Sequence, residues 1–360
     1  MAFRRIYEDF KDARGSDVEL FVRDVQVHDA MNGAFSFVYR ATINKVLEDG
    51  TDEEPSQLVA IKRTNILKAK DFRELHILRR LSSHRQPHPN IANLMYYQRR
   101  EVMVEAAYSL VFEFVPATLA QLKTEYFENR NVLDIKLCMW QLFAGLDHLK
   151  KLNIIHRDIK PTNLLVNPTS GRLTIADFGS AIYLPRYINR YQLNYIVDRF
   201  YRPPELILGA ERYDCLLDVW SAGCVFAELY LGEALFKGNS QINQLQFIYT
   251  KLGTPTVHDL KCMRVDVDTF IPAVKSQAVN PFQELFTIFE EKDYSPEQNP
   301  ASLLVKILHF NPRKRLNGRP LLRDEFFQEL FQPKKRRIGG ELVTNAISLE
   351  QQQQYFNNNY

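Results

Sequence analysis

Hydrophobic and polar residues alternate from residue 18 to residue 43, and Asn32-Gly33 interrupts the alternation. A period of two residues predicts strands with one buried face, and an Asn-Gly dipeptide between such strands is typical of a tight hairpin. A third apolar stretch over residues 58–62 predicts another strand. Residues 1–17 are mixed and charged, so we expect a loosely held lead-in there.

The pattern then changes from strands to helices. Apolar residues recur every three or four positions over 68–81 and 134–151, as in amphipathic helices. Residues 218–231 are apolar almost all round, which predicts a buried central helix. Residues 333–360 combine a basic run with glutamine and asparagine repeats, and we expect a disordered tail because this composition buries little apolar surface.

Composition narrows the class of protein. The 360 residues are 45% hydrophobic and 25% charged, as in soluble globular proteins, and a net charge of +3 gives no reason to expect nucleic-acid binding. The four cysteines form no C-x-x-C pair, which favours reduced thiols inside the cell. With no apolar run of membrane-spanning length and no signal-peptide core, we expect no membrane partner.

Two segments carry candidate chemistry. Residues 156–163 read His-Arg-Asp-Ile-Lys-Pro-Thr-Asn, and Asp-Phe-Gly follows at 177–179. Phosphoryl transfer from a nucleotide needs this inventory: one acid to position a hydroxyl, and oxygen ligands to hold magnesium. Together the segments resemble the catalytic core of eukaryotic protein kinases. The alternative, ordinary loop carboxylates, is disfavoured because further parts of that core are present.

One such part is a lysine with a candidate acidic partner. Lys62 follows the apolar run Val-Ala-Ile, and Glu74 lies on the apolar face of the predicted helix 68–81. A buried acid is costly unless paired, so we expect a Lys62–Glu74 ion pair. Without the resemblance, Lys62 could simply extend to the sheet edge. The resemblance implies that Lys62 binds nucleotide phosphate and that Glu74 holds it.

The second half resembles the CMGC group of kinases, and most closely the glycogen synthase kinase 3 family. The motifs that carry this resemblance are residues 177–181, Tyr195-Ile196, residues 199–207, residues 218–224 and residues 251–256. The family implies an α+β, two-lobed protein kinase fold that transfers phosphate to protein serine or threonine. A small β-rich lobe with one main helix would span 18–114, and a larger α-helical lobe would span 115–332.

The resemblance also implies roles for single residues. Asp158 would orient the substrate hydroxyl and Lys160 would neutralise the transferring phosphoryl group, while Asn163 and Asp177 would bind Mg²⁺. The cofactors would be ATP and Mg²⁺. The other implied nucleotide contacts, besides Lys62 and Glu74, are Met31, Gly33, Val38, Ala60, Glu113, Val115 and Leu165. Glu205 and Arg315 match a buried ion pair that closes the activation segment.

Some positions depart from the family pattern. The turn that covers the phosphates usually has three glycines, and here it has Met31, Gly33 and Ser36. Asp198 replaces a serine or threonine, where its carboxylate should pair with Lys160 and repel the catalytic carboxylate. These departures motivate a second hypothesis, a pseudokinase scaffold with weak nucleotide binding. We favour an active kinase because every group that performs chemistry is retained.

Substrate choice follows from a further departure. In the family, three basic residues bind a phosphate already present on the substrate. Arg73 and Arg157 match two of them, but the third position is Ile182. We therefore expect a weakened dependence on such primed substrates. Arg186 or Arg190 could replace the missing cation, and the sequence does not fix their direction.

Regulation and partners rest on the same resemblance. Tyr195 matches a tyrosine that the family autophosphorylates, and an exposed loop tyrosine without that role is an equal alternative. Besides protein substrates, a scaffold protein is expected on the helix near Ile242–Leu252. The basic run 333–337 has the composition of a nuclear import signal, and a solvated basic helix end is the alternative. We expect a cytoplasmic and nuclear protein.

Overall fold

The chain forms two compact units, residues 1–116 and 117–360. The sequence had placed this division after residue 114. The first unit is built from strands and one helix, whereas the second is mostly helical, in agreement with the predicted α+β class. The computed structural model describes residues 6–27, 36–46, 55–66, 72–83, 87–102, 105–184, 196–266, 282–347 and 351–353.

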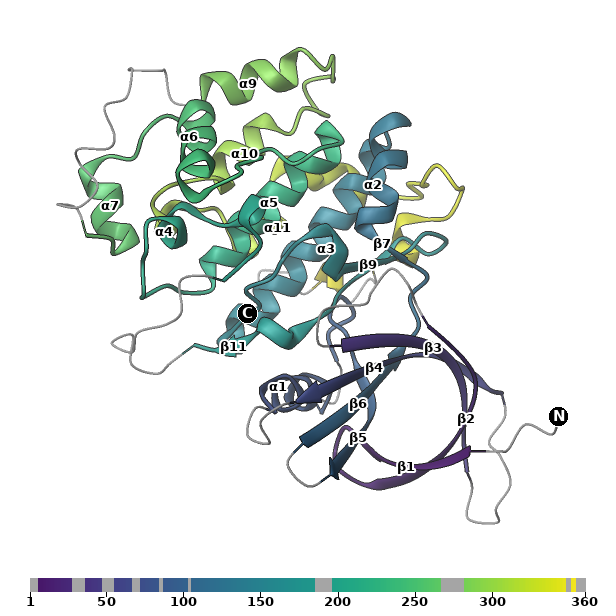
Figure 1. Ribbon diagram of the computed structural model, residues 1–360. Helices are drawn as coiled ribbons and strands as arrows, with labels where there is room; N and C mark the ends of the chain where they lie inside the picture. Colours follow the sequence, from purple (N-terminus) through teal and green to yellow (C-terminus); the bar gives the residue numbers. More distant parts are fainter. Residues whose placement is uncertain are drawn as a thin grey trace. The chain divides into compact units, whose positions relative to one another are not determined.

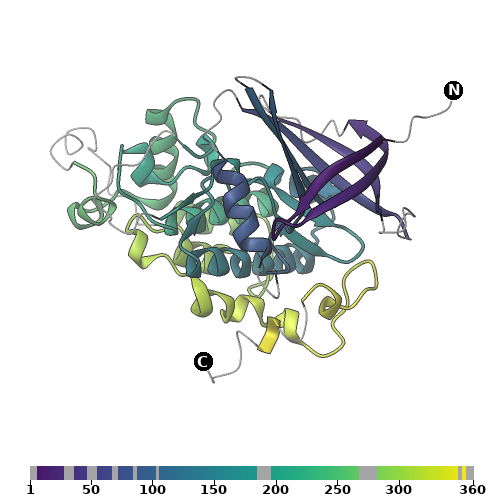
Figure 2. The same cartoon turned by 90° about the horizontal axis from the view of Figure 1, so that it is seen from below.

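In the described residues of the first unit, the strands form a closed barrel in the order β1–β2–β3–β4–β6–β5 (Figure 1). Figure 2 shows the same strands after a 90° turn. Neighbouring strands are antiparallel, which lets each strand bury one face in the interior of the barrel. The elements are β1 (Ile6–Asp12), β2 (Asp17–Val27), β3 (Ser36–Lys45), β4 (Gln57–Ile66), helix α1 (Arg73–Ser82), β5 (Leu94–Val102) and β6 (Glu105–Glu113).

The lead-in expected for residues 1–17 is wrong for residues 6–12, which form β1. This strand pairs with β2 along its length and with β5 at its end, where Lys11 lies opposite Tyr97. Phe10 is buried in the barrel core together with Leu20 and Val59. The strand was missed because its exposed face is charged, and one buried aromatic residue is a weak periodic signal.

The three strands predicted from the alternation are present as β2, β3 and β4. The predicted antiparallel pairing is present between β2 and β3, with a register shift between Arg23 and Gln26, while the predicted turn at Asn32-Gly33 lies outside the described residues. The third strand is longer than the apolar stretch 58–62, because Arg63 and Thr64 still pair with β6. Pairing between backbones does not require apolar side chains, so the sequence pattern underestimated this strand.

The second unit contains mainly helices. Its helices are α2 (Leu119–Glu128), α3 (Val132–Lys151), α4 (Pro204–Ile207), α5 (Leu216–Leu231), α6 (Gln241–Leu252), α7 (Val257–Met263), α9 (Gln283–Glu290), α10 (Ala301–Ile307) and α11 (Gly318–Leu322). Its short strands are β7 (Ala117–Thr118), β8 (Ile154–Ile155), β9 (Leu164–Asn167), β10 (Arg172–Ile175) and β11 (Ile182–Tyr183). Among the described residues, no helix has the combination of length and apolar character that crossing a membrane requires.

Helices α3 and α5 form the centre of this unit, and both are buried over most of their length. For α5 this burial was predicted, because residues 218–231 are apolar almost all round the helix. Helix α3 begins at Val132, two residues before the predicted start, because the Asn131 side chain accepts a hydrogen bond from the Asp134 backbone N–H and caps the helix. Trp140 of α3 and Trp220 of α5 are fully buried.

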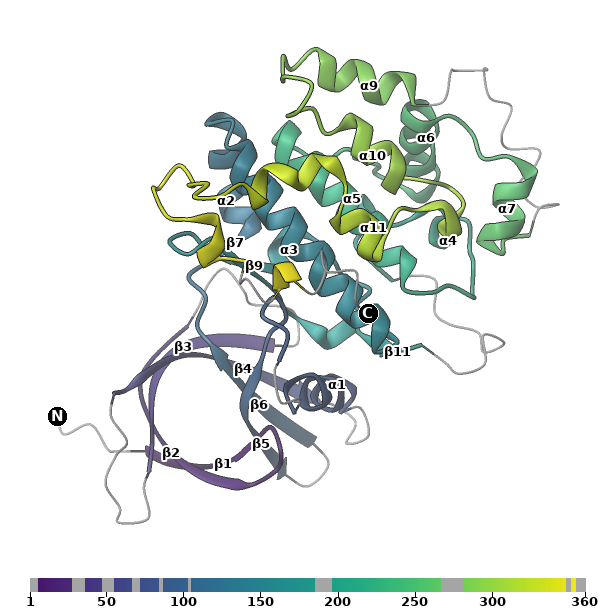
Figure 3. The same ribbon diagram turned by 180° about the vertical axis from the view of Figure 1, so that it is seen from behind.

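The disordered tail predicted for residues 333–360 is wrong for residues 333–347. This segment, yellow in Figure 3, lies against α3. Arg337 is only 6% exposed, and its guanidinium donates to both carboxylate oxygens of Asp134 on α3, at 2.7 and 3.1 Å. A low-complexity composition did not reveal this order, because the partner of the arginine lies about two hundred residues earlier in the chain.

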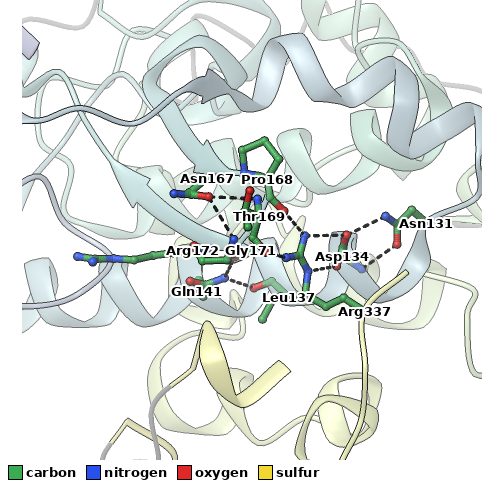
Figure 4. Close-up of polar contacts among 11 residues, drawn as sticks. Asn131, Asp134, Leu137, Gln141, Asn167, Pro168, Thr169, Gly171, Arg172 and Arg337 are labelled. Atoms are coloured by element: carbon green, nitrogen blue, oxygen red, sulfur yellow. Dashed lines mark hydrogen bonds and ion pairs between the residues drawn. The ribbon is translucent and has the colours of Figure 1, made fainter. Parts of the chain in front are cut away.

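The same arginine holds the turn between β9 and β10 (Figure 4). It donates to the carbonyl oxygens of Thr169 at 2.8 Å and Pro168 at 2.9 Å. Gly171 has φ +74°, and a Cβ there would lie 2.8 Å from the guanidinium. From the other side, Gln141 donates to the Gly171 carbonyl at 2.8 Å. The turn is therefore fixed between α3 and the segment that follows residue 333.

We predict that Arg337→Ala lowers the free energy of unfolding of the second unit by about 3–5 kcal/mol, because it leaves a buried Asp134 carboxylate without its cation. The exposed neighbour Arg336 is the matched control, and Arg336→Ala should change it by less than about 0.5 kcal/mol. Urea denaturation of both variants measures the difference. Equal effects would mean that the Arg337–Asp134 pair does not hold the segment in place.

Candidate active site

In the first unit, the expected Lys62–Glu74 ion pair is confirmed. Lys62 on β4 and Glu74 on α1 are 2.6 Å apart between Nζ and Oε1, and their side chains are 14% and 6% exposed. The hydroxyl of Tyr108 on β6 donates to the other oxygen, Oε2, at 2.6 Å. Glu74 is thus a buried carboxylate held at both oxygens, and this geometry fixes the lysine.

The other candidate nucleotide contacts of this unit lie on its strands. Val38 on β3 is directly opposite Lys62 in the ladder, and Ala60 on β4 is opposite Phe112. Glu113 ends β6, opposite Val59, and Val115 lies two residues beyond it. The strand pairing brings Val38 and Ala60 to the same part of the sheet as Lys62. The remaining candidates, Met31 and Gly33, lie outside the described residues.

In the second unit, the catalytic segment is anchored to α5. The Asp218 carboxylate is buried and accepts the backbone N–H of His156 at 2.7 Å and of Arg157 at 2.9 Å. Burial raises the pKa of Asp218, although the His156 and Arg157 donors oppose that rise. Two donors to one buried carboxylate satisfy it and set the position of the residues just before Asp158.

Asp158, Lys160 and Asn163 lie together. The Asn163 Nδ2 group donates to the Asp158 backbone carbonyl and to Oδ2 of its carboxylate, both at 2.8 Å. Lys160 Nζ lies 3.2 Å from the same oxygen. Because both contacts are made to Oδ2, the carboxylate is oriented while Oδ1 points elsewhere. Leu165 follows on β9, opposite Thr118 and Thr174.

Asp177 is held beside this segment by its neighbours in the chain. His156 Nδ1 accepts from the Asp158 backbone N–H at 3.3 Å, so we assign the proton to Nε2, which lies 3.0 Å from the Ala176 carbonyl. The Ala176 N–H donates to the Asn163 carbonyl at 2.9 Å. The Phe178 ring packs edge-on against the His156 ring, with centroids 4.9 Å apart. The two candidate metal-binding residues thus belong to one hydrogen-bonded assembly.

Left-handed backbone conformations occur at three non-glycine positions of this region: Arg157 has φ 66°, Asp177 has φ 60° and Val197 has φ 67°. Such conformations cost energy, most of all at a β-branched residue, and persist where the surroundings over-determine them. Each of these residues adjoins or belongs to a candidate functional position. The backbone strain therefore supports an active site at these segments.

Oxygen ligands suit magnesium, and the donor set of this unit fits it. Asn163 commits its Nδ2 group to Asp158, which leaves its amide oxygen as the metal ligand. Asp177 is exposed and accepts the Gly179 N–H at 3.3 Å through Oδ1. Magnesium usually keeps several waters and binds substrate phosphates, so phosphate oxygens and water would complete the shell around these two ligands.

Asp198 lies where the sequence placed it, near Lys160. Its Oδ2 is 3.9 Å from Lys160 Nζ, so the expected pairing is confirmed as a long ion pair. Lys160 therefore lies between two carboxylates, the nearer being that of Asp158.

The structure describes both candidate phosphate ligands, Arg157 and Arg73, and the position that lacks a cation, Ile182. Arg157 is buried, and its guanidinium donates to the Ser180 carbonyl at 2.7 Å and to the Tyr213 hydroxyl at 3.2 Å. Ile182 is half-buried on β11. Arg73 begins α1 in the first unit, where it is exposed. Tyr195, Arg186 and Arg190 lie outside the described residues.

The predicted Glu205–Arg315 pair is confirmed. Both side chains are buried, and Arg315 donates to the two Glu205 oxygens at 2.7 and 2.6 Å. Arg315 also donates to the Leu216 and His309 carbonyls, and its guanidinium lies over the Trp220 ring at 5.1 Å. The pair thus ties α4 to the start of α5.

A family model described as "Protein kinase domain" matches residues 32–327. The chain is also similar to "Glycogen synthase kinase 1" from Pyricularia oryzae, with 37% identity over 310 residues that cover 84% of this chain and 72% of the relative. The chain therefore belongs to the protein kinase family.

Within that family it is an ATP-dependent serine/threonine kinase of the glycogen synthase kinase 3-like type, so the predicted activity and two-lobed kinase fold are confirmed. The pseudokinase alternative is not favoured. Protein kinases act on protein substrates and generally use ATP and Mg²⁺.

Sequence reasoning missed two residues that position the candidate site. Asp218 was assigned to a buried helix and to a family motif but given no role, although an acid in such a helix is costly unless it has a partner. Tyr108 gave no such signal, because the sequence does not show which group the hydroxyl of a tyrosine in a strand will contact. Its contact with Glu74 depends on the pairing of β4 with β6 and on the position of α1.

We predict that Tyr108→Phe raises the KM for ATP. Glu74 would lose one of two hydrogen bonds, and a loss of about 0.5–1.5 kcal/mol in the positioning of Lys62 corresponds to a roughly two- to tenfold change. Steady-state kinetics on a generic peptide measures it. Tyr97→Phe removes a hydroxyl from another buried tyrosine of the barrel and is the matched control. A KM that changes equally in both variants would contradict a specific role for Tyr108.

Proposed function

We propose that this kinase transfers the γ-phosphate of ATP to protein serine or threonine with Asp158 as the residue that accepts the substrate proton. The observation that carries the proposal is the convergence of Asn163 and Lys160 on one oxygen of Asp158. With Oδ2 held in this way, Oδ1 would receive the hydroxyl proton as the substrate oxygen bonds to the γ-phosphorus. The bond from that phosphorus to the bridging oxygen would break, and ADP would leave. General-base assistance of this kind typically contributes about 10²–10⁴-fold.

The remaining groups have electrostatic roles in the proposal. Lys160 would offset charge on the transferring phosphoryl group, since its ammonium already lies beside the proton acceptor. Lys62, fixed by Glu74, would bind nucleotide phosphate oxygens. Val38, Ala60 and Leu165 would supply apolar contacts to the base, while Glu113 and Val115 would supply backbone hydrogen bonds. Met31 and Gly33 would cover the phosphates.

Mg²⁺ bound by Asn163 and Asp177 would neutralise charge on the phosphate oxygens of ATP. For this role the chain must present oxygen atoms at a fixed spacing. The hydrogen bond from the Ala176 N–H to the Asn163 carbonyl supports that requirement, because it joins the two segments that carry these ligands.

Two variants should separate proton transfer from metal binding. We expect Asp158→Asn to lower kcat by about 10²–10⁴-fold and to keep the magnesium-dependent thermal stabilisation by ATP. Asp177→Asn should lose that stabilisation, because a metal ligand is removed. Turnover assays and thermal unfolding with and without Mg²⁺ measure the two effects. An Asp158→Asn enzyme with full turnover would show that another group accepts the proton.

We further propose that a phosphate already on the substrate improves catalysis only slightly. Arg73 and Arg157 are the proposed ligands for that phosphate. The proposal is supported by Ile182, which supplies no charge, and by Arg157, which already donates to Ser180 and Tyr213. Less positive potential would then be available to offset the desolvation of a phosphate dianion.

Adding the missing cation should strengthen this preference. We expect Ile182→Lys to raise the ratio of kcat/KM for a primed peptide over its unprimed form by about tenfold, since one charge-assisted hydrogen bond contributes roughly 1.5–3 kcal/mol. Ile182→Gln, which is polar and neutral, is the control and should leave the ratio unchanged. The proposal is wrong if the unaltered enzyme already requires primed peptides strictly.

Partners and location are also proposals. The exposed apolar residues of α6, Ile242 at 73% and Phe247 at 36%, are candidates for contact with a scaffold protein, and Ile242→Lys should abolish any such association measured with a purified partner. Tyr195 would be an activation-segment phosphosite, which mass spectrometry of the purified enzyme tests.

Nuclear as well as cytoplasmic location would depend on the basic run 333–337. This run does not lie outside the folded unit, as the sequence had suggested, because Arg337 is buried and Lys335 bonds to Glu329. Only its exposed Lys334 and Arg336 could meet an import receptor. The nuclear fraction of a variant with alanine at both positions tests the proposal.

A further inference from the structure

Asp198 places a second carboxylate next to the proposed proton acceptor. Lys160 Nζ lies 3.2 Å from Asp158 Oδ2 and 3.9 Å from Asp198 Oδ2. The Asp198 side chain is 43% exposed, whereas that of Asp158 is 18% exposed. Because both oxygens contact the same lysine, the two Oδ2 atoms are at most ~7 Å apart, which is about two residues of extended chain. A substrate chain with its hydroxyl at Asp158 would therefore pass close to Asp198.

The backbone that carries Asp198 is fixed on both sides. Before it, the Val197 carbonyl accepts two hydrogen bonds from Arg202, at 2.7 and 3.1 Å. After it, the Tyr201 carbonyl accepts from the Ser221 hydroxyl of α5 at 2.9 Å, and the Tyr201 hydroxyl donates to the buried Glu228 carboxylate at 2.6 Å. The carboxylate therefore projects from a backbone that is held in one conformation.

The arginines around Asp198 direct their guanidinium groups to oxygen atoms other than its carboxylate. Arg199 donates to the Asn239 carbonyl at 2.8 Å, Arg202 to the Ile196 and Val197 carbonyls, and Arg157 to Ser180 and Tyr213. Among the described residues, Asp198 forms an ion pair with Lys160. The Lys160 ammonium lies closer to Asp158 than to Asp198. Two carboxylates thus share one ammonium group, so the charge of Asp198 is only partly compensated by its ion pair.

An exposed aromatic residue follows Asp198 two positions later in the chain. Phe200 is 37% exposed, and its backbone N–H donates to Asp198 Oδ1 at 3.4 Å. A lysine or arginine side chain combines an apolar stem with a cationic end, and it suits a carboxylate next to an aromatic ring. A glutamate or aspartate at the same place would meet like charge.

We propose that Asp198 and Phe200 form a subsite for a lysine or arginine of the substrate that lies immediately beside the target serine or threonine. Asp198 would be a specificity-determining residue that binds the cationic end, while Phe200 would contact the stem. The proposal rests on the proposed role of Asp158, because that role fixes where the target hydroxyl lies.

The test uses peptides with a single target serine and with arginine, glutamine or glutamate at the position directly before or directly after it. For the full-length enzyme, we expect kcat/KM to be about two- to fivefold higher with arginine than with glutamine at one of these positions, as for an exposed ion pair. Glutamate should be disfavoured by a similar factor. The preference for arginine should shrink when salt is raised, because salt screens exposed charges.

Substitutions then assign the preference to this surface. Asp198→Asn keeps the shape of the side chain and should bring the arginine-to-glutamine ratio to about one. Phe200→Ala should reduce it in part. Glu290→Gln removes an exposed carboxylate at the end of α9 and should leave it unchanged. The salt dependence is measured on the unaltered enzyme, so the test does not depend on the folding of any variant.

The outcomes separate this proposal from the role of Asp158. An arginine-to-glutamine ratio of one in the unaltered enzyme overturns the subsite, and so does an Asp198→Asn enzyme that loses turnover equally on all peptides. In the latter case Asp198 would act only by placing Lys160. If Asp158→Asn transfers phosphate as well as the unaltered enzyme on the same peptides, the proposed role of Asp158 fails instead.

Discussion

The catalytic segment in the second unit of this kinase depends on the hydrogen bonds that the buried Asp218 carboxylate accepts. A carboxylate inside an apolar helix bundle is costly, and here two backbone N–H groups, those of His156 and Arg157, satisfy it. Those donors stand directly before Asp158, so satisfying the charge also sets where the proton acceptor lies. His156 then extends the constraint to the Ala176 carbonyl, and so to the residue before Asp177.

Helix α5, which carries Asp218, also holds other functional segments of the second unit. Its Ser221 and Glu228 bond to Tyr201 and fix the backbone that follows Asp198. Its Trp220 lies under the guanidinium of Arg315, which pairs with Glu205. Because the helix is buried on nearly every side, its polar groups have few alternatives to these partners. One rigid element thus positions the catalytic segment and the proposed substrate subsite.

Polar groups far apart in the chain also define the limits of the folded units. The Arg337–Asp134 pair adds residues beyond the match to the kinase domain, which ends at residue 327, to the second unit. In the first unit, pairing of β1 with β2 and β5 closes the barrel with residues that precede that match. The added residues are partly buried: Phe10 in the first unit, and Arg337, Val343 and Ile347 in the second.

The sequence by itself determined the family, the catalytic segment and the main helices, because local periodicity and short motifs encode them. It also predicted two ion pairs. The Lys62–Glu74 pair was expected because an acid in an apolar stripe needs a cationic partner, and the Glu205–Arg315 pair because both residues match the family pattern. Only the tertiary structure decided which strand closes the barrel, what Tyr108 and Asp218 bind, and where Arg337 lies. The physical reason is that these contacts join residues that no local pattern relates, and burial in the folded chain selects each partner.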